Sequence, residues 1–436
     1  MNILKNKIFR NASWIVGCRI MQSVFSLIIS MLTARYLGPS NYGIISYAAS
    51  IVAFVVPIMQ LGLSNTLVHE TVEHSDEEGK IFGTSILMSM CSSVLCIIGI
   101  AGFVSVANFG DTETIITCIL YSALLICQAV EMIQYWYQAK LASKYVSIVS
   151  LCAYVVVSVY KLFLLITGKS VYWFALSNAI DYLLIAISLL IIYKKLGGQR
   201  LSFSMTTAKR MFSSSKYYIV SSMMVTVFAQ TDKIMLMLMK DDTTTGYYSA
   251  AVTCAGMTSF VFSAIIDSAR PAIFESRKTD EAAFEKNMSR LYCIIIYVSL
   301  LQSLFMTILA KPVIGILYGE AYYPAIPALQ LIVWYTTFSY LGSVRNIWIL
   351  AEQKQKYLWI INLSGALGNV ILNFILIPEF GILGAAFASL VTQIFTNVII
   401  GFIIKPIRRN NRLMFKGLNP FIILELVIKK KDKKHN

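Results

Sequence analysis

Residues 228–242 read FAQTDKIMLMLMKDD and hold two charges, Asp232 and Lys233, inside a run of apolar side chains. The run belongs to a longer apolar segment, 214–239, and about 20 such residues can cross a bilayer as a helix. An ionised side chain at mid-bilayer costs about 2.5–3.5 kcal/mol on insertion scales. The stretch therefore predicts a membrane helix whose charged positions face other helices or a wet cavity.

The whole chain has the composition of a membrane protein. Of its 436 residues 57% are hydrophobic and 14% are charged, whereas soluble domains contain about 25% charged residues. The mean hydropathy is +0.69, and no stretch resembles a cleaved signal peptide. We expect an all-α protein with twelve membrane spans, at residues 11–35, 42–68, 81–106, 114–139, 145–167, 171–193, 214–239, 246–270, 287–310, 325–350, 357–377 and 382–404.

The positive charges predict how these spans are oriented. The net charge is +15, which in a soluble protein would suggest a nucleic-acid partner. Here 29 of the 37 Lys and Arg residues fall in the segments that share a side with the N-terminus, and only four fall on the other side. Cytoplasmic segments of membrane proteins carry such an excess. We therefore expect a multi-pass protein of the cytoplasmic membrane with both termini in the cytoplasm and no nucleic-acid partner.

The cysteine and histidine pattern predicts neither disulfides nor a bound metal or cofactor. All eight cysteines lie in apolar spans, and no C-x-x-C spacing occurs. The three histidines, His69, His74 and His435, lie in predicted loops or in the tail.

The two halves of the chain resemble each other. NYGIISYAAS (41–50) aligns with TTGYYSAAVT (244–253), and KYVSIVSL (144–151) aligns with KYLWIINL (356–363) in the same order. We expect an N-terminal six-helix bundle at 1–199, a C-terminal six-helix bundle at 200–404 and a basic cytoplasmic tail at 405–436. Since six is even, the bundles would be related by a pseudo-twofold axis along the membrane normal.

Charged residues within the spans are the candidate functional groups. A cavity lined by Arg19, Lys161, Lys233 and Arg345 would be positive and would suit the phosphate of a lipid head group. Lys161 and Arg345 could instead extend to the membrane surface. Asp181 and Glu131 are either proton or ion carriers or partners for the cations. Asp232 could form an interhelical salt bridge, and Asp267 and Arg270 are spaced to pair on one helix face.

Two stretches carry a resemblance to a known family. ARYLGPSNYGIISYAAS (34–50), with its R-Y-L-G-P-x-x-Y-G element, and QTDKIMLMLMKDDTTTGYYSAAV (230–252) resemble the polysaccharide-repeat-unit flippases (Wzx type). That family lies in the multidrug/oligosaccharidyl-lipid/polysaccharide exporter superfamily, and the resemblance covers essentially the whole chain.

The resemblance implies that the protein is a transporter and not an enzyme. It implies movement of a polyprenyl-pyrophosphate-linked oligosaccharide between leaflets by alternating access, coupled to an H⁺ or Na⁺ gradient. The partners implied are membrane lipid and polysaccharide polymerase machinery. Ion coupling or gating would fall to Asp232, Asp181, Glu131, Arg35, Asp267 and Arg270. Only FIILELVI (421–428) follows the last span, which is too short for the two extra helices of the related lipid II flippases. We expect it to lie at the interface, with KKKDKKH held by anionic lipid.

Two other functions stay open at this point. A cation-coupled multidrug antiporter of the same superfamily would need an acidic cavity, and here the cations in the spans match or outnumber the acids. A membrane oligosaccharide polymerase would present a sizeable outer loop, which the predicted spans do not leave room for. The glycan carried, the coupling ion and the oligomeric state are not indicated by the sequence.

Overall fold

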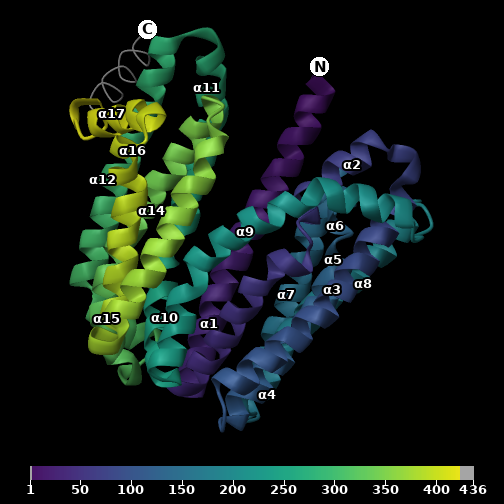
Figure 1. Ribbon diagram of the computed structural model, residues 1–436, viewed down its shortest axis with the longest axis horizontal. Helices are drawn as coiled ribbons and strands as arrows, with labels where there is room; N and C mark the ends of the chain where they lie inside the picture. Colours follow the sequence, from purple (N-terminus) through teal and green to yellow (C-terminus); the bar gives the residue numbers. More distant parts are fainter. Residues whose placement is uncertain (1, 423–436) are drawn as a thin grey trace. The chain divides into compact units, whose positions relative to one another are not determined.

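The computed structural model describes the backbone of residues 2–422 and the side chains of 17, 18 and 20–422; the predicted interfacial segment and lysine-rich end at 423–436 lie outside the described residues. Within this part every regular element is a helix (Figure 1), which confirms the all-α prediction. The longer α-helices are α1 (Asn2–Met59), α3 (Glu78–Ala107), α4 (Thr112–Ser122), α7 (Ser143–Ile166), α8 (Val171–Lys195), α9 (Met205–Met239), α10 (Asp242–Gly256), α11 (Ser259–Thr279), α12 (Glu281–Ile308), α14 (Ile326–Ala351) and α15 (Leu358–Ile394). The shorter ones are α2 (Leu67–Glu73), α5 (Leu124–Glu131), α6 (Gln134–Ala139), α13 (Ala310–Leu317), α16 (Ile400–Ile403) and α17 (Arg408–Lys416). Turns of 3₁₀ or π-helix complete the described part: η1 (Leu63–Asn65), η2 (Ser75–Glu77), η3 (Glu320–Ala325), η4 (Gln355–Tyr357), η5 (Phe395–Ile399) and η6 (Lys405–Ile407).

Each of the twelve predicted spans overlaps helix in this part of the chain. Two helices contain a pair of spans, because α1 breaks at Gly38 (φ 74°) and α15 breaks at Gly381 (φ 53°). Among residues 2–422, eight helices are long and apolar enough to cross a membrane, or nine if α10 and α11, bent by 41°, form one span. The helix α14, rich in Tyr, Trp and Thr, also coincides with a predicted span. The chain is therefore a multi-pass membrane protein.

One predicted span is shorter than expected. Within the segment predicted at 42–68, α1 ends at Met59, after which Leu61 (φ 52°) and Gly62 (φ 68°) form a left-handed turn. A Cβ atom on Gly62 would lie 2.4 Å from the Ser215 carbonyl oxygen, so only glycine fits this turn against α9.

The first compact unit, unit 1, comprises Met1–Gly246. Within it α1 packs along α7 and α9, and α8 packs against α5 and α7 (Figure 1). The Ser204 hydroxyl caps α9 by accepting a hydrogen bond of 3.3 Å from the Thr207 amide. The helix α9 thus carries Asp232 and Lys233 into unit 1.

Two glycines that the sequence repeat pairs, Gly43 and Gly246, form a close helix crossing in unit 1. A Cβ atom on Gly43 would lie 1.8 Å from the Asp242 carbonyl oxygen, and one on Gly246 would lie 1.9 Å from the Pro39 carbonyl oxygen. The Ser40 hydroxyl donates a 2.7 Å hydrogen bond to Asp242 at the same crossing. The two contacts are reciprocal, because Pro39 and Asp242 are also equivalent positions of the repeat.

The second unit, unit 2, comprises Tyr247–Asn436. Its helices α11, α12, α14 and α15 pack around an apolar core that includes Phe262 stacked on Tyr340, with ring centroids 3.9 Å apart, and the fully buried Trp348. The boundary at Gly246 differs from the repeat boundary expected at 199/200, because α9 makes its contacts with α1 and α3 of unit 1. The division into 1–199, 200–404 and 405–436 rests on the repeat alone and stays a prediction.

Candidate functional site

Unit 1 contains a polar cavity among its membrane helices. The cavity has a volume of about 550 Å³, which is large beside the roughly 30 Å³ that one water occupies in the liquid. Helices α1, α5, α6, α7 and α8 supply its lining: Cys18, Gln22, Glu131, Gln134, Gln138, Ser143, Val146, Ser147, Ser150, Asp181, Tyr182 and Ile185. Ten of these twelve side chains carry a polar or ionisable group, so the cavity suits a hydrophilic occupant.

Helical spacing brings these polar groups together. Residues Glu131, Gln134 and Gln138 follow one another at three and four positions, which places them on one face of the α5–α6 segment. Ser143, Ser147 and Ser150 repeat the pattern in α7. Between α5 and α6 the backbone tightens into i→i−3 hydrogen bonds, such as Met132 to Ala129. Tight turns of this kind within a helix often mark hinges or strain.

The charges around the cavity are acidic with one cation nearby. Glu131 is only 8% exposed, and Asp181 has a carboxylate oxygen, Oδ1, that is buried with no hydrogen-bond partner among the described residues. Lys161 donates a 3.3 Å hydrogen bond to Asn178, one turn before Asp181 on α8, and its charge interacts favourably with Asp181. The cavity thus joins Glu131 and Asp181, and Lys161, which does not line it, interacts with Asp181. Such a site can hold a proton, a small cation or a hydroxyl-rich group.

The charged pair of the apolar run 228–242, Asp232 and Lys233, lies elsewhere in unit 1. Asp232 is 8% exposed and makes a polar contact within the structure, whereas Lys233 is half-buried beside it on α9. Arg35 is exposed on α1, three residues before the break at Gly38, and also has a polar contact. A common cavity for Lys161, Lys233 and Arg345 stays a prediction.

Arg345 is buried in unit 2 and bonded to the backbone. The side chain is 4% exposed and donates a hydrogen bond to the Thr396 carbonyl oxygen. Thr396 lies in the π-helical turn η5, where widened hydrogen bonding leaves carbonyl groups for other donors. The Arg345 Nε atom has no hydrogen-bond partner among the described residues. Arg345 therefore does not extend to the surface of unit 2.

The remaining predicted residues divide into one observed pair and one undescribed side chain. Asp267 and Arg270 form an ion pair of 2.9 Å on α11, which confirms that they pair along one helix face. Both side chains are exposed, at 64% and 47%. Arg19 lies within α1, but its side chain is outside the described residues.

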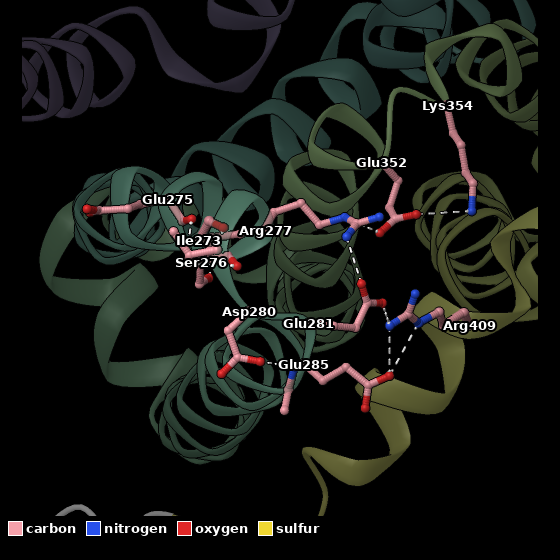
Figure 2. Close-up of polar contacts among 12 residues, drawn as sticks. Ile273, Glu275, Ser276, Arg277, Asp280, Glu281, Glu285, Glu352, Lys354 and Arg409 are labelled. Carbon is pink, nitrogen blue, oxygen red and sulfur yellow. Dashed lines mark hydrogen bonds and ion pairs between the residues drawn. The ribbon is translucent and has the colours of Figure 1, made fainter.

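One end of unit 2 carries a network of ion pairs (Figure 2). Arg277 of α11 contacts Glu352 at 2.8 Å and Glu281 at 2.7 Å. Arg409 of α17 contacts Glu281 and also Glu285, the latter at 3.0 Å. Burial lowers the pKa of the Arg409 guanidinium, but its hydrogen bonds to the two glutamates raise that pKa to a net value above the ordinary one. The network holds α11, α12, α14 and α17 together at the end that the charge distribution predicts to be cytoplasmic.

Unit 1 has a smaller network at its own predicted cytoplasmic end. Glu78 is 5% exposed, accepts a 2.8 Å hydrogen bond from the Trp136 indole and pairs with Lys140 at 2.5 Å. Arg210 of α9 pairs with Glu70 at 3.2 Å. These contacts fix the end of α6 to the start of α3, and α9 to α2.

The uncharged residues of the cavity were missed by the sequence analysis. The charged residues alone do not indicate Gln22, Gln134 and Gln138. The helical spacing of Gln134 and Gln138 from Glu131 was a signal that could have found two of them. The contact between α5–α6 and α8 could not be read from spacing, since it joins separate helices.

Comparisons with known proteins agree with this architecture. MurJ, a lipid II flippase in an inward closed conformation, superimposes with a TM-score of 0.67 at 15% identity, over 96% of this chain and 92% of that chain. A multidrug resistance MATE family transporter of the MOP superfamily, in an inward-facing conformation, gives 0.65 at 12% identity, over 89% and 96%. A eukaryotic MATE transporter gives 0.57 at 14% identity, over 94% and 100%. The chain therefore has the two-lobed fold of these transporters. No curated protein matches its sequence.

The sequence also matches a known protein family. The family described as polysaccharide biosynthesis protein matches residues 8–277, from the first predicted span through α11. This range includes the R-Y-L-G-P-x-x-Y-G element, the polar cavity of unit 1 and the Asp232–Lys233 pair. Because the match spans more than half of the chain, the chain belongs to the family of polysaccharide biosynthesis proteins.

Proposed function

We propose that the protein is a flippase of the Wzx type, which moves a polyprenyl-pyrophosphate-linked oligosaccharide across the cytoplasmic membrane. The observation that carries the proposal is the family match over residues 8–277 in a chain whose fold is that of MurJ and MATE transporters. The substrate would pass between leaflets chemically unchanged, by alternating access, for polymerisation by separate machinery. Both termini would lie in the cytoplasm.

The polar cavity of unit 1 would couple this movement to a cation gradient. Glu131 and Asp181 repel each other when both are ionised, so binding of H⁺ or Na⁺ relieves the repulsion and the desolvation of a buried carboxylate. Lys161 offsets one of the two negative charges. Occupied and empty cavities would then favour different conformations, as any ligand does that binds two states unequally.

The phosphates of the substrate would be bound by cations of the spans. Lys233 on α9 and Lys161 on α7 are half-buried within unit 1. Arg19 and Arg345 would complete this phosphate-binding set. Arg35, Asp232, Asp267 and Arg270 would serve ion coupling or gating. A lysine contributes a point charge to phosphate, and arginine contributes paired hydrogen bonds.

A second candidate function is cation-coupled multidrug antiport. The observation in its favour is the cavity itself, because Glu131 and Asp181 make it acidic, as a site for organic cations would be. Against it stand Lys161 beside Asp181 and the family match.

Transport by the reconstituted protein separates the two candidates. Proteoliposomes would receive a fluorescent polyprenyl-pyrophosphate sugar, and protection from an external quencher would report its movement. A flippase protects the labelled lipid in a gradient-dependent way and does not expel a cationic dye. Dye efflux without movement of the lipid would identify the antiporter.

A further inference from the structure

The outward face of α17 is basic and unlike the rest of that helix. Arg408 and Arg412 lie one turn apart on it, and Lys405 precedes them; all three side chains are exposed. Lys405 and Arg412 have no ion-pair partner within the described residues, and the Arg408 Nε atom donates a 2.7 Å hydrogen bond to the Phe402 carbonyl oxygen. Three exposed cations thus gather where the last span ends.

The opposite face of α17 is fixed to unit 2. The Tyr292 hydroxyl donates a 2.8 Å hydrogen bond to Asn410, and the Asn411 amide donates one of 2.8 Å to the Val398 carbonyl oxygen. A Cβ atom on Gly401 would lie 2.1 Å from the Asn411 side-chain oxygen, so glycine permits this approach. With the Arg409 pairs (Figure 2), these contacts present the outward face in a fixed orientation.

Exposed apolar side chains lie beside the three cations. Phe402 is 49% exposed and Phe415 is 44% exposed, with ring centroids 5.7 Å apart, and Leu418 is 49% exposed. A basic helix with exposed aromatic groups at the end of a membrane span is typical of a helix that lies in the interfacial layer of a bilayer.

We propose that Lys405, Arg408 and Arg412 bind the phosphate groups of anionic phospholipids in the leaflet that meets this end of unit 2. Charge complementarity selects an anionic lipid, since the cations are exposed and Lys405 and Arg412 are not neutralised by described carboxylates. The adjoining phenylalanine rings and Leu418 contact the upper part of the acyl chains, which a free phosphate ion does not offer.

Lipid binding to the purified full chain tests this site. Native mass spectrometry would measure affinity for phosphatidylglycerol and for phosphatidylcholine, and inorganic phosphate would serve as competitor. The test variant is Lys405→Gln with Arg412→Gln. The control is Lys194→Gln with Lys195→Gln, which removes the same charge from the exposed end of α8 in unit 1. A thermal unfolding scan without lipid checks that both variants are folded.

The expected result is a loss of phosphatidylglycerol affinity of roughly 30-fold in the test variant, about fivefold per cation, and no comparable loss in the control. Arg408→Lys with Arg412→Lys keeps the charge and should retain most of the affinity. Equal losses in both Gln variants, equal binding of the two lipids by the native chain, or displacement by equimolar inorganic phosphate would each overturn the proposal.

Discussion

At the scale of single residues, the surroundings of Glu131 bear most directly on the proposed ion coupling. The side chain is 92% buried in a membrane bundle, lines a cavity and faces a second carboxylate, Asp181. A carboxylate buried in a membrane bundle is costly, and an ionisable group inside a membrane span is by default a candidate functional residue.

We predict that Glu131→Gln loses gradient-driven transport while the protein stays folded. The amide keeps the shape of the side chain but cannot bind a proton or be neutralised by Na⁺. Coupling free energies are about 1–3 kcal/mol, so transport should fall about tenfold or more. Transport in proteoliposomes measures the loss, with the exposed Glu379→Gln as control. Unchanged gradient dependence in Glu131→Gln would remove the cavity from the mechanism.

We also predict that Glu78→Ala is strongly destabilising. The substitution strands the Trp136 indole N–H and removes the partner of Lys140, and breaking a buried pair costs about 3–5 kcal/mol, less here because Lys140 is 45% exposed. The neighbouring Glu77→Ala removes the more exposed pairs with Lys80 and Arg210 and should cost less. Thermal unfolding in detergent would compare the stabilities of the two variants. Equal losses of stability would contradict the prediction.

Pairs within one helix were predictable at this scale, and pairs between helices were not. Asp267 and Arg270 were expected to pair because three positions separate them on a helix, and they do. Glu78 begins α3 and Lys140 follows α6, with α4 and α5 between them, so only the packed fold brings them together.

At the scale of elements, the crossing of Gly43 and Gly246 in unit 1 is the tightest helix contact that the repeat marks. Both glycines come from the segments whose alignment, 41–50 with 244–253, revealed the repeat. We predict that Gly43→Ala destabilises unit 1 by about 1–3 kcal/mol or more, because the new methyl group meets backbone and not a flexible side chain.

A matched control for this crossing is Gly99→Ala on α3, which has no atom within 4 Å of the added Cβ. Helix propensity favours alanine by about 1 kcal/mol at both positions, so the difference between the variants isolates the contact. Thermal unfolding of the two proteins in the same detergent measures it. Equal stability of the two variants would show that the crossing can relax.

Element boundaries were predicted where glycine or charge marked them. The gap predicted between 357–377 and 382–404 coincides with the break at Gly381, and the gap after 35 coincides with Gly38. The early end of α1 at Met59 was missed, because the apolar residues that follow, Leu61 and Leu63, enter a buried turn and not a helix.

At the scale of the whole molecule, charge distribution predicts the orientation of the chain in the membrane. We expect Lys195→Cys to react with a membrane-impermeant maleimide only after the cells are permeabilised, and Lys169→Cys to react in intact cells. Both positions are exposed, and the variants would be made in a background without the eight native cysteines. The reverse labelling pattern would contradict the predicted topology.

Fold class and membrane character followed from composition and apolar length alone, because each span must satisfy its own backbone hydrogen bonds. The polar cavity could not be predicted in this way, since it forms only where particular faces of five helices meet. The repeat predicted two six-helix bundles. The packing of α9 in unit 1 depends on contacts that the repeat does not indicate.

The most direct measurement is movement of a fluorescent polyprenyl-pyrophosphate sugar in proteoliposomes under an imposed H⁺ or Na⁺ gradient, with the wild type beside Glu131→Gln and Glu379→Gln. The account predicts that the wild type and Glu379→Gln protect the labelled lipid from an external quencher and that Glu131→Gln does not. Absence of protection with the wild type, together with gradient-driven efflux of a cationic dye, would contradict the flippase and establish an antiporter.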